Sequence, residues 1–397
     1  MVPRSAALYL GVVQFLFATT WTIYVIYLPQ LAAQAGIDKR WVPWILLADQ
    51  VVFAIMDVVT GFWVDRVRAG LARFGGWILG MACVSGAAFL LLPFAGASPA
   101  LLLGLVFVWA VASSALRSPP WALLSRYAAT PTVPWLSTLV LTGTAVAGAI
   151  APYLGIALRG VDPRVPFVVS TLTLLAAVGG LVWVERRLAG ASPQPAGEAE
   201  PMFDLASAEG RRLVVVFFAA VAVMAIGFQV HFSLNSASQY LRYAAGADLQ
   251  YLMPVFWIGF NVLMFPASGF VKRHGAFAVL AVSAAAGGIA TLCAALAPSL
   301  ELLVAAQFVA GGCWGAMSVG IYSATIAFGR AKREGALLGA MFAVLALAAF
   351  VRIGVVAGNL NGLPEMKALL PWLPHIGWLA AGLLLAAALG AARRRAV

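Results

Sequence analysis

The strongest constraint on this chain is a repeated apolar segment of bilayer-spanning length. A membrane-crossing helix needs about 20 predominantly apolar residues, and such runs recur along the whole sequence. Charged residues make up 10% of the 397 residues, whereas soluble proteins carry about 25%. The chain therefore lacks the polar side chains to cover a water-facing surface, and we predict an all-α integral membrane protein with twelve transmembrane helices. The predicted spans are 6–33, 41–66, 75–94, 99–126, 134–157, 165–185, 212–241, 251–271, 275–297, 300–328, 335–360 and 371–391.

The longest polar stretch divides these spans six and six. It runs from Glu185 to Arg212 and is rich in proline, glycine and acidic residues, as expected of a flexible linker. We therefore predict an N-terminal six-helix bundle over 1–186, a linker over 187–211 and a C-terminal six-helix bundle over 212–397. The second span of each half ends in a similar way, at Gly61–Arg66 and Gly269–Arg273, which favours two pseudo-symmetric halves.

The distribution of basic residues predicts the orientation in the membrane. Seventeen of the 25 Lys and Arg residues lie in the loops and ends on the side of both termini, and six lie on the other side. Because cytoplasmic loops are enriched in Lys and Arg, both termini and the linker are expected in the cytoplasm of a cell (inner or plasma) membrane protein. The same scattered pattern does not indicate nucleic-acid binding, despite the net charge of +11.

Several function classes are disfavoured. The cysteines Cys83, Cys293 and Cys313 lie inside apolar segments without metal-ligand spacing, so we expect no metal and no cofactor. HExxH, GxSxG and a Cys nucleophile beside a His are missing from the sequence, so we expect no enzyme. The first apolar run exceeds signal-peptide length and is interpreted as a retained helix.

Two opposite charges lie at one depth inside the predicted spans. Asp57 is nine residues before Arg66, and Arg117 is nine residues before Arg126. At about 1.5 Å per residue, both lie about 13 Å inside the same boundary. Either charge alone is costly in a membrane, so we expect the two to pair. The pair either fixes two helices statically or changes partner or protonation state during transport.

The region around Asp57 carries a family resemblance. It reads Asp57-Val-Val-Thr-Gly61-Phe-Trp-Val-Asp65-Arg66, and Arg73-Phe74-Gly75-Gly76-Trp77 follows. This resembles the helix 2–3 signature of the major facilitator superfamily and, more narrowly, the glycoside–pentoside–hexuronide:cation symporters, which include melibiose permease. The resemblance implies a major facilitator fold, alternating access, and a coupling-cation role for Asp57. The helix 4 segment Arg117-Ser-Pro-Pro-Trp121 has Arg117 where that family has an acidic residue. This departure disfavours sodium and favours a proton, an anionic substrate or no coupling ion.

Two further charge sets are predicted to act as gates. At the cytoplasmic end, Asp65, next to Arg66, is placed to pair with a loop arginine or to accept from a helix N-terminus. Near the outer end, Asp49 and Arg352 lie roughly 12–14 Å from one boundary. In the resembled fold their helices belong to opposite halves and face each other. An Asp49–Arg352 pair is then expected when the outside is closed, unless Arg352 extends outward and Asp49 bonds a neighbour.

Polar and aromatic residues suggest the substrate cavity. The segment around 229–239 places His231, Asn235, Ser238 and Gln239 along one helical face, which we expect to face water. An unperturbed histidine titrates near neutral pH, although a lone histidine in a helix is more often a plain hydrogen-bonding residue than a proton carrier. The full set of predicted cavity residues is Gln14, Thr19, Trp21, Tyr24, Trp121, His231, Asn235, Gln239, Asn261, Trp314 and Tyr322.

The leading functional prediction is a secondary active transporter of a small solute, with proton-coupled sugar or organic-anion symport as the favoured form. The alternative within transport is an exporter or flippase of an amphipathic solute or lipid. The alternative outside transport is a membrane receptor or scaffold. The expected partners are a small-molecule substrate, a coupling proton and the lipid bilayer, with no nucleic acid, and we expect a monomer.

Overall fold

The computed structural model describes residues 4–66, 71–117, 121, 124–125, 128, 130–189, 207–329 and 333–395. These residues are almost entirely helical, and no strand occurs among them. The first half contains α1 (Arg4–Gln34), α2 (Val42–Arg66), α3 (Leu71–Leu91), α4 (Pro99–Ser114), α6 (Val133–Ala157) and α7 (Arg164–Ala189). The second half contains α8 (Ala208–Phe228), the π-helical segment η4 (Gln229–Asn235), α9 (Ser236–Tyr240), α11 (Pro254–His274), α12 (Ala276–Leu296), α13 (Leu300–Gly329), α14 (Glu334–Ala357) and α16 (Leu373–Arg395), with short α10 (Leu249–Leu252) and α15 (Pro364–Leu369) between spans.

The helix lengths confirm the predicted membrane fold class. Within the described residues, ten helices are long and apolar enough to cross a bilayer, and two shorter apolar helices cover 99–114 and 164–180. These two coincide with the predicted spans 99–126 and 165–185. The first of them is shorter than predicted because α4 ends at Ser114. Pro119 and Pro120 follow, and proline lacks the N–H that a continuing helix needs.

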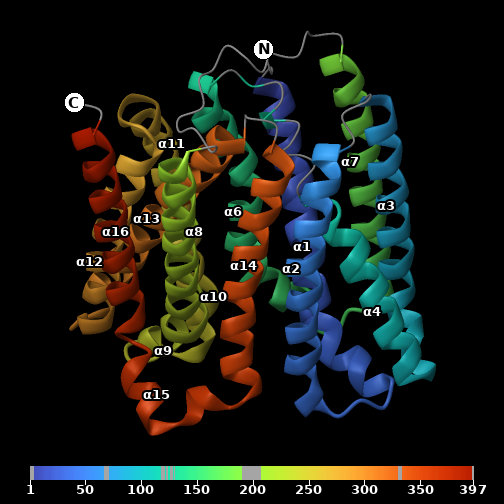
Figure 1. Cartoon of the computed structure of the whole chain (residues 1–397). Helices are drawn as coiled ribbons and strands as arrows, with labels where there is room; N and C mark the ends of the chain where they lie inside the picture. Colours follow the sequence, from blue (N-terminus) through green and yellow to red (C-terminus); the bar gives the residue numbers. More distant parts are fainter. Residues whose placement is uncertain are drawn as a thin grey trace.

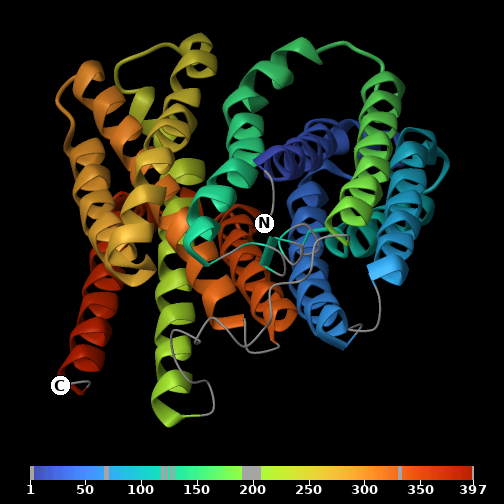
Figure 2. The ribbon, with the colours of Figure 1, turned by 90° about the horizontal axis from the view of Figure 1, so that it is seen from above.

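The helices form two halves that lie side by side. Figure 1 shows both chain ends at one end of the bundle, which we call the terminal face, and the opposite end is called the far face. Seen from above in Figure 2, the helices of the first half lie on one side and those of the second half on the other. The predicted linker 187–211 falls mostly outside the described residues, so its boundaries stay a prediction.

The halves meet mainly along three helix pairs. α2 packs against α14, and α6 packs against α11 and α13. At the α2–α14 contact, a Cβ on Gly61 would clash with the carbonyl oxygen of Gly335, and a Cβ on Gly339 would clash with that of Asp57. Small residues let helix backbones approach closely in membranes. Glycine is thus required here for the halves to touch.

Large apolar side chains cover the outside of the bundle. Leu383 on α16 is 72% exposed and Val282 on α12 is 70% exposed. Continuous apolar exposure of this kind is unfavourable in water and is satisfied by lipid tails. The exposed surface therefore agrees with a bilayer as the surrounding solvent.

Candidate functional site

The predicted charge pair is present between α2 and the segment that follows α4. Asp57 is 0% exposed, and Arg117 retains 20% exposure of its side chain. The Arg117 Nε atom donates to Oδ1 of Asp57 at 3.2 Å, and Nη2 donates to Oδ2. A bidentate guanidinium–carboxylate contact satisfies both ions in an apolar surrounding. The depth argument therefore located the partners correctly, while the role of the pair stays a prediction.

Aromatic rings from both halves enclose this pair. The Arg117 guanidinium lies 4.8 Å from the ring centre of Phe53 on α2 and 5.7 Å from that of Phe342 on α14. Trp121 of the first half stacks on Tyr322 of α13, with ring centres 3.9 Å apart. Tyr322 in turn contacts Phe342 edge-on at 6.0 Å. Any separation of the halves in this region must therefore uncover the ion pair.

A second polar contact joins the halves at the terminal face. The Asp65 carboxylate at the end of α2 accepts hydrogen bonds from the backbone N–H groups of Gly335 at 2.7 Å and Ala336 at 2.9 Å. These N–H groups belong to the first turn of α14, whose unsatisfied donors attract an anion. The carboxylate of one half thus caps a helix of the other half. Arg66 is exposed and makes no ion pair with the described part of the chain.

The predicted pair between Asp49 and Arg352 is not formed in this state, and Asp49 bonds a neighbouring hydroxyl, which is the alternative that the sequence left open. The backbones do lie at one level, since a Cβ on Gly354 of α14 would lie 3.7 Å from Leu47 of α2. Asp49 instead accepts a hydrogen bond from the Tyr24 hydroxyl of α1 at 2.7 Å. The Arg352 Nε atom is buried and has no hydrogen-bond partner among the described residues. Depth was predictable, but the direction of Asp49 around the helix was not.

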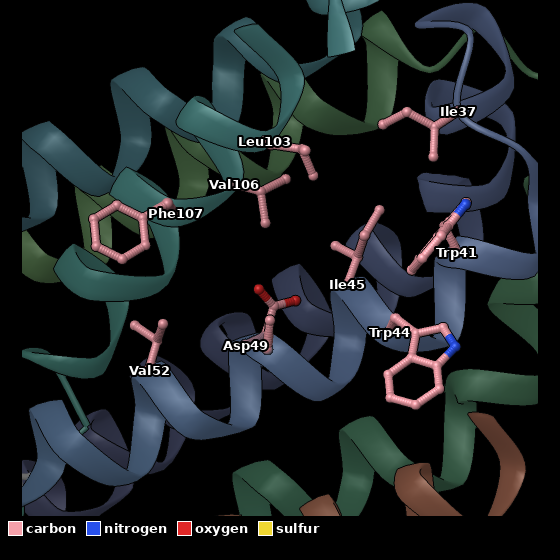
Figure 3. Close-up of a pocket in the computed structure, with 10 residues that line it drawn as sticks. Ile37, Trp41, Trp44, Ile45, Asp49, Val52, Leu103, Val106 and Phe107 are labelled. Atoms are coloured by element: carbon pink, nitrogen blue, oxygen red, sulfur yellow. The ribbon is translucent and has the colours of Figure 1, made fainter. Parts of the chain in front are cut away.

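Asp49 lies in a groove between α2 and α4. The groove has a volume of about 410 Å³, and its walls include Trp41 and Trp44 near the far face together with Leu103 and Phe107 of α4. Figure 3 shows the Asp49 carboxylate directed into the space between the two helices. Asp49 itself is only 3% exposed. Within this groove it is the one acidic side chain among apolar and aromatic walls.

The expected water-facing stripe in the second half is also corrected. His231 Nε2 lies 3.0 Å from Oε1 of Gln307 on α13, and the Gln307 amide donates to Oε1 of Gln239 at 2.9 Å. Asn235 donates to the carbonyl of Leu370 at 2.8 Å. All of these side chains are buried. The π-helical segment η4 alters the helical register through this region, so His231, Asn235 and Gln239 bond to protein groups rather than face water. Ser238 is exposed and donates to the carbonyl of Asn235 at 2.8 Å.

The remaining predicted cavity residues do not converge on the Asp57–Arg117 pair. Gln14 is half-buried on α1, and the Thr19 hydroxyl donates to the carbonyl of Phe15 in its own helix at 2.8 Å. The Asn261 amide donates within its own helix to Trp257 at 2.9 Å. Trp314 stacks on Phe228, with ring centres 4.7 Å apart. Trp21 and Tyr24 belong to an aromatic cluster with Trp109 near Asp49.

Three functional positions were missed at the sequence level. Phe342 supplies an aromatic face to Arg117, Gln307 links the buried polar network, and Gly335 allows the α2–α14 approach. Two carry a usable signal: Gln307 is an amide within an apolar span, and Gly335 begins a Gly-x-x-x-Gly spacing with Gly339. Among the described residues, no group of three or more His, Cys, Asp or Glu side chains is arranged to hold a metal ion.

Solved structures with the same helix arrangement provide the structural comparison. The human organic anion transporter MFSD10 (TETRAN) aligns with a TM-score of 0.71 at 14% identity, covering 97% of this chain and 100% of that one. A bacterial homologue of the iron transporter ferroportin, in its outward-facing state, gives 0.69 at 14% identity, covering 98% and 100%. The E. coli fucose:proton symporter FucP gives 0.62 at 15% identity, covering 98% of each chain. At these identities the likeness shows the fold.

Sequence comparison identifies the family directly. No curated protein is significantly similar to the chain in sequence. The sequence profile of the Major Facilitator Superfamily matches residues 10–353, a range that extends from α1 into α14 and includes the Asp57–Arg117 pair and the Asp65 cap. With two six-helix halves meeting along α2–α14 and α6–α11, this chain belongs to the Major Facilitator Superfamily of transporters.

Proposed function

We propose that this protein is a secondary active transporter that moves a small solute across the membrane by alternating access. The observation that carries the proposal is the polar contact between the halves at the terminal face. There, Asp65 of α2 caps the first turn of α14 through two hydrogen bonds. Such a contact holds one face closed and is reversible, because water satisfies the same groups once the halves separate.

The substrate class follows from the charge left partly exposed. Arg117 keeps 20% of its side chain exposed while its partner is fully buried. A guanidinium suits a carboxylate in a bidentate geometry, so we propose a sugar or an organic anion as the solute. Asp57 is the proposed proton acceptor, because its protonation would release Arg117 for the substrate. The narrower resemblance to the melibiose permease family supports the sugar option, and the fold likeness to an organic anion transporter supports the anion option.

The terminal face is proposed to be cytoplasmic, and the chain to work as a monomer in the cell (inner or plasma) membrane. The excess of Lys and Arg in loops on that side motivates the orientation. The Asp65 cap would then be an inner gate, and the Asp49–Arg352 pair would remain the proposed outer gate, formed only when the far face closes.

Export or flipping of an amphipathic solute is the second candidate. The groove between α2 and α4 favours it, because exposed Trp44 and Phe107 flank an opening toward lipid. A solute taken directly from the membrane would use this side entrance. A solute taken from water would not need it.

Distance measurements on both faces test the proposal. One doubly spin-labelled variant, Lys39→Cys with Lys367→Cys, reports the far face, and another, Ser5→Cys with Arg212→Cys, reports the terminal face; all four positions are exposed. In lipid nanodiscs, acidification or addition of glucuronate, fucose or lactate should lengthen one distance while shortening the other. Uptake of the effective solute into proteoliposomes, driven by an imposed pH gradient, should follow. Unchanged distances on both faces across all conditions would contradict alternating access.

A further inference from the structure

The groove around Asp49 combines three features that the central pair does not explain. It lies between α2 and α4 within the membrane-spanning region, about 12 Å along α2 from Asp57 at 1.5 Å per residue. Its volume of about 410 Å³ is within the range of about 300–1,000 Å³ typical of small-molecule sites. Its mouth is aromatic, with Trp41, Trp44 and Phe107 exposed by 51%, 45% and 58%. The groove is therefore accessible from the lipid.

The Asp49 carboxylate has no cationic partner in the described part of the chain. Tyr24 donates one hydrogen bond to Oδ2 at 2.7 Å, and no described residue donates to Oδ1. Arg352, which is at the same level on α14, forms no ion pair with it in this state. An ionised carboxylate at membrane depth is costly unless a positive charge or hydrogen bonds compensate it. The groove thus presents a buried carboxyl group that lacks a cationic partner among the described residues, and a bound cation would stabilise its ionised form.

We propose that this groove binds a hydrophobic organic cation that enters from the lipid bilayer. The cationic centre pairs with Asp49, and the apolar body lies between the rings of Trp44 and Phe107. Aromatic faces attract organic cations in addition to the ion pair. A lipid acyl chain alone would leave the carboxylate uncompensated. A metal ion would need several oxygen ligands, and the groove supplies only the carboxylate of Asp49.

Contacts inside the first half connect this groove to the central pair. Tyr24 packs on Trp21 with ring centres 5.4 Å apart, and Trp21 contacts Phe53 at the same separation. Phe53 in turn lies against Arg117. Occupation of the groove can therefore influence the central site through one chain of packed rings. The binding itself does not depend on the proposed transport function.

Two probe ions of the same shape and opposite charge test the inference. Tetraphenylphosphonium should bind the full-length protein in nanodiscs, measured by equilibrium dialysis, and tetraphenylborate should not bind at the same site. Asp49→Asn should weaken tetraphenylphosphonium binding about tenfold or more, since one partner of a buried charge pair is lost. Asp162→Asn, the same change of charge in the loop before α7, where the carboxylate accepts from the backbone N–H of Arg164, should leave it unchanged. Equal loss in both variants, or unaltered binding in Asp49→Asn, would overturn the proposal.

A second experiment keeps Asp49 in place, so its result does not depend on whether Asp49→Asn folds correctly. It measures how far a bound ion protects a cysteine in the groove from alkylation. Cys83, Cys293 and Cys313 are first replaced by alanine, and Leu103→Cys, which keeps both Trp44 and Phe107, is then introduced in the groove wall. Tetraphenylphosphonium should slow its alkylation by a lipid-soluble maleimide, while tetraphenylborate should not. Leu383→Cys, on the lipid-facing side of α16, is the control and should react at the same rate with either ion. Equal protection at both positions, or none at Leu103→Cys, refutes a site in the groove.

Discussion

The Asp65 cap makes a sharp prediction about the balance between open and closed states. Its two oxygens accept the N–H groups of Gly335 and Ala336 at 2.7 and 2.9 Å. The acceptor and the donors lie on different halves, so the contact exists only while the terminal ends of α2 and α14 touch. Asp65→Ala removes both hydrogen bonds without changing either helix elsewhere. The substitution does not destabilise the open state, because water already hydrates the N–H groups of Gly335 and Ala336 once the halves have separated.

The expected shift follows from the two contributions that Asp65 makes. Loss of a helix N-cap costs about 0.5–2 kcal/mol, and a negative charge at a helix N-terminus adds about 0.3–1 kcal/mol. Together they come to about 2 kcal/mol for this contact. Since about 1.4 kcal/mol corresponds to a factor of ten, the population ratio should move about 30-fold toward the state with an open terminal face.

Spin labels at Ser5→Cys and Arg212→Cys measure this population. The longer distance should rise from a minor to a dominant component in Asp65→Ala. Asp162→Ala is the matched control, because that carboxylate accepts only from the backbone N–H of Arg164, at 2.9 Å, within one loop of the first half. A distribution that Asp65→Ala leaves unchanged, or that Asp162→Ala alters equally, would refute the reasoning.

Three further predictions address the remaining elements. Asp57→Asn should lower the free energy of unfolding by about 3 kcal/mol, since Arg117 loses its partner. The double variant Asp57→Arg with Arg117→Asp should unfold at a higher temperature than either of its single variants, and equal melting temperatures would contradict this. Gln307→Leu should lower the free energy of unfolding by about 1–3 kcal/mol, because it leaves the buried side chains of His231 and Gln239 without their partner. An unchanged melting temperature in detergent would argue against a stabilising role for this hydrogen-bond network. Single cysteines at Ser192 and Ala396, both outside the described residues, should resist impermeant thiol reagents in intact cells, and labelling from outside would overturn the topology.

The sequence alone was sufficient to predict the features that depend on depth in the membrane. Lipid demands apolar segments of a fixed length, so the spans could be identified from composition alone. Counting residues from the ends of two spans placed Asp57 and Arg117 at one depth, and they do pair. A helix N-terminus was one of the two partners expected for Asp65, besides a loop arginine, and Asp65 caps α14. The rise per residue of a helix was enough to predict the Asp57–Arg117 contact. The unsatisfied N–H groups at a helix N-terminus were enough to suggest the Asp65 contact.

Orientation around each helix could not be predicted in the same way. Each residue rotates the side chain by about 100°, so a small error in register or tilt changes which neighbour is met. Asp49 is at the level of Arg352 but turns toward Tyr24. His231 lies in the π-helical segment η4 and meets Gln307. A single sequence contains no signal for that extra-wide turn.

Two contacts that join the halves, the Asp65 cap at the terminal face and the Trp121–Tyr322 stack beside the central pair, are of the size that a reversible transporter requires. The Asp65 cap contributes about 2 kcal/mol, and the Trp121–Tyr322 stack, which also joins the two halves, adds about 0.5–1.5 kcal/mol. Their sum stays below the roughly 5.5 kcal/mol of differential binding that moves a two-state equilibrium from one extreme to the other. A ligand can therefore open this face. By the same reasoning, the Asp49–Arg352 contact proposed for the closed far face must be of comparable strength. In alternating access the far face is closed while the terminal face is open, so a stronger ion pair would trap the protein in that state. The Tyr24 hydroxyl already stabilises the Asp49 carboxylate through a hydrogen bond. It therefore reduces the free energy that Asp49 gains by turning to Arg352, and so limits the strength of the proposed Asp49–Arg352 contact.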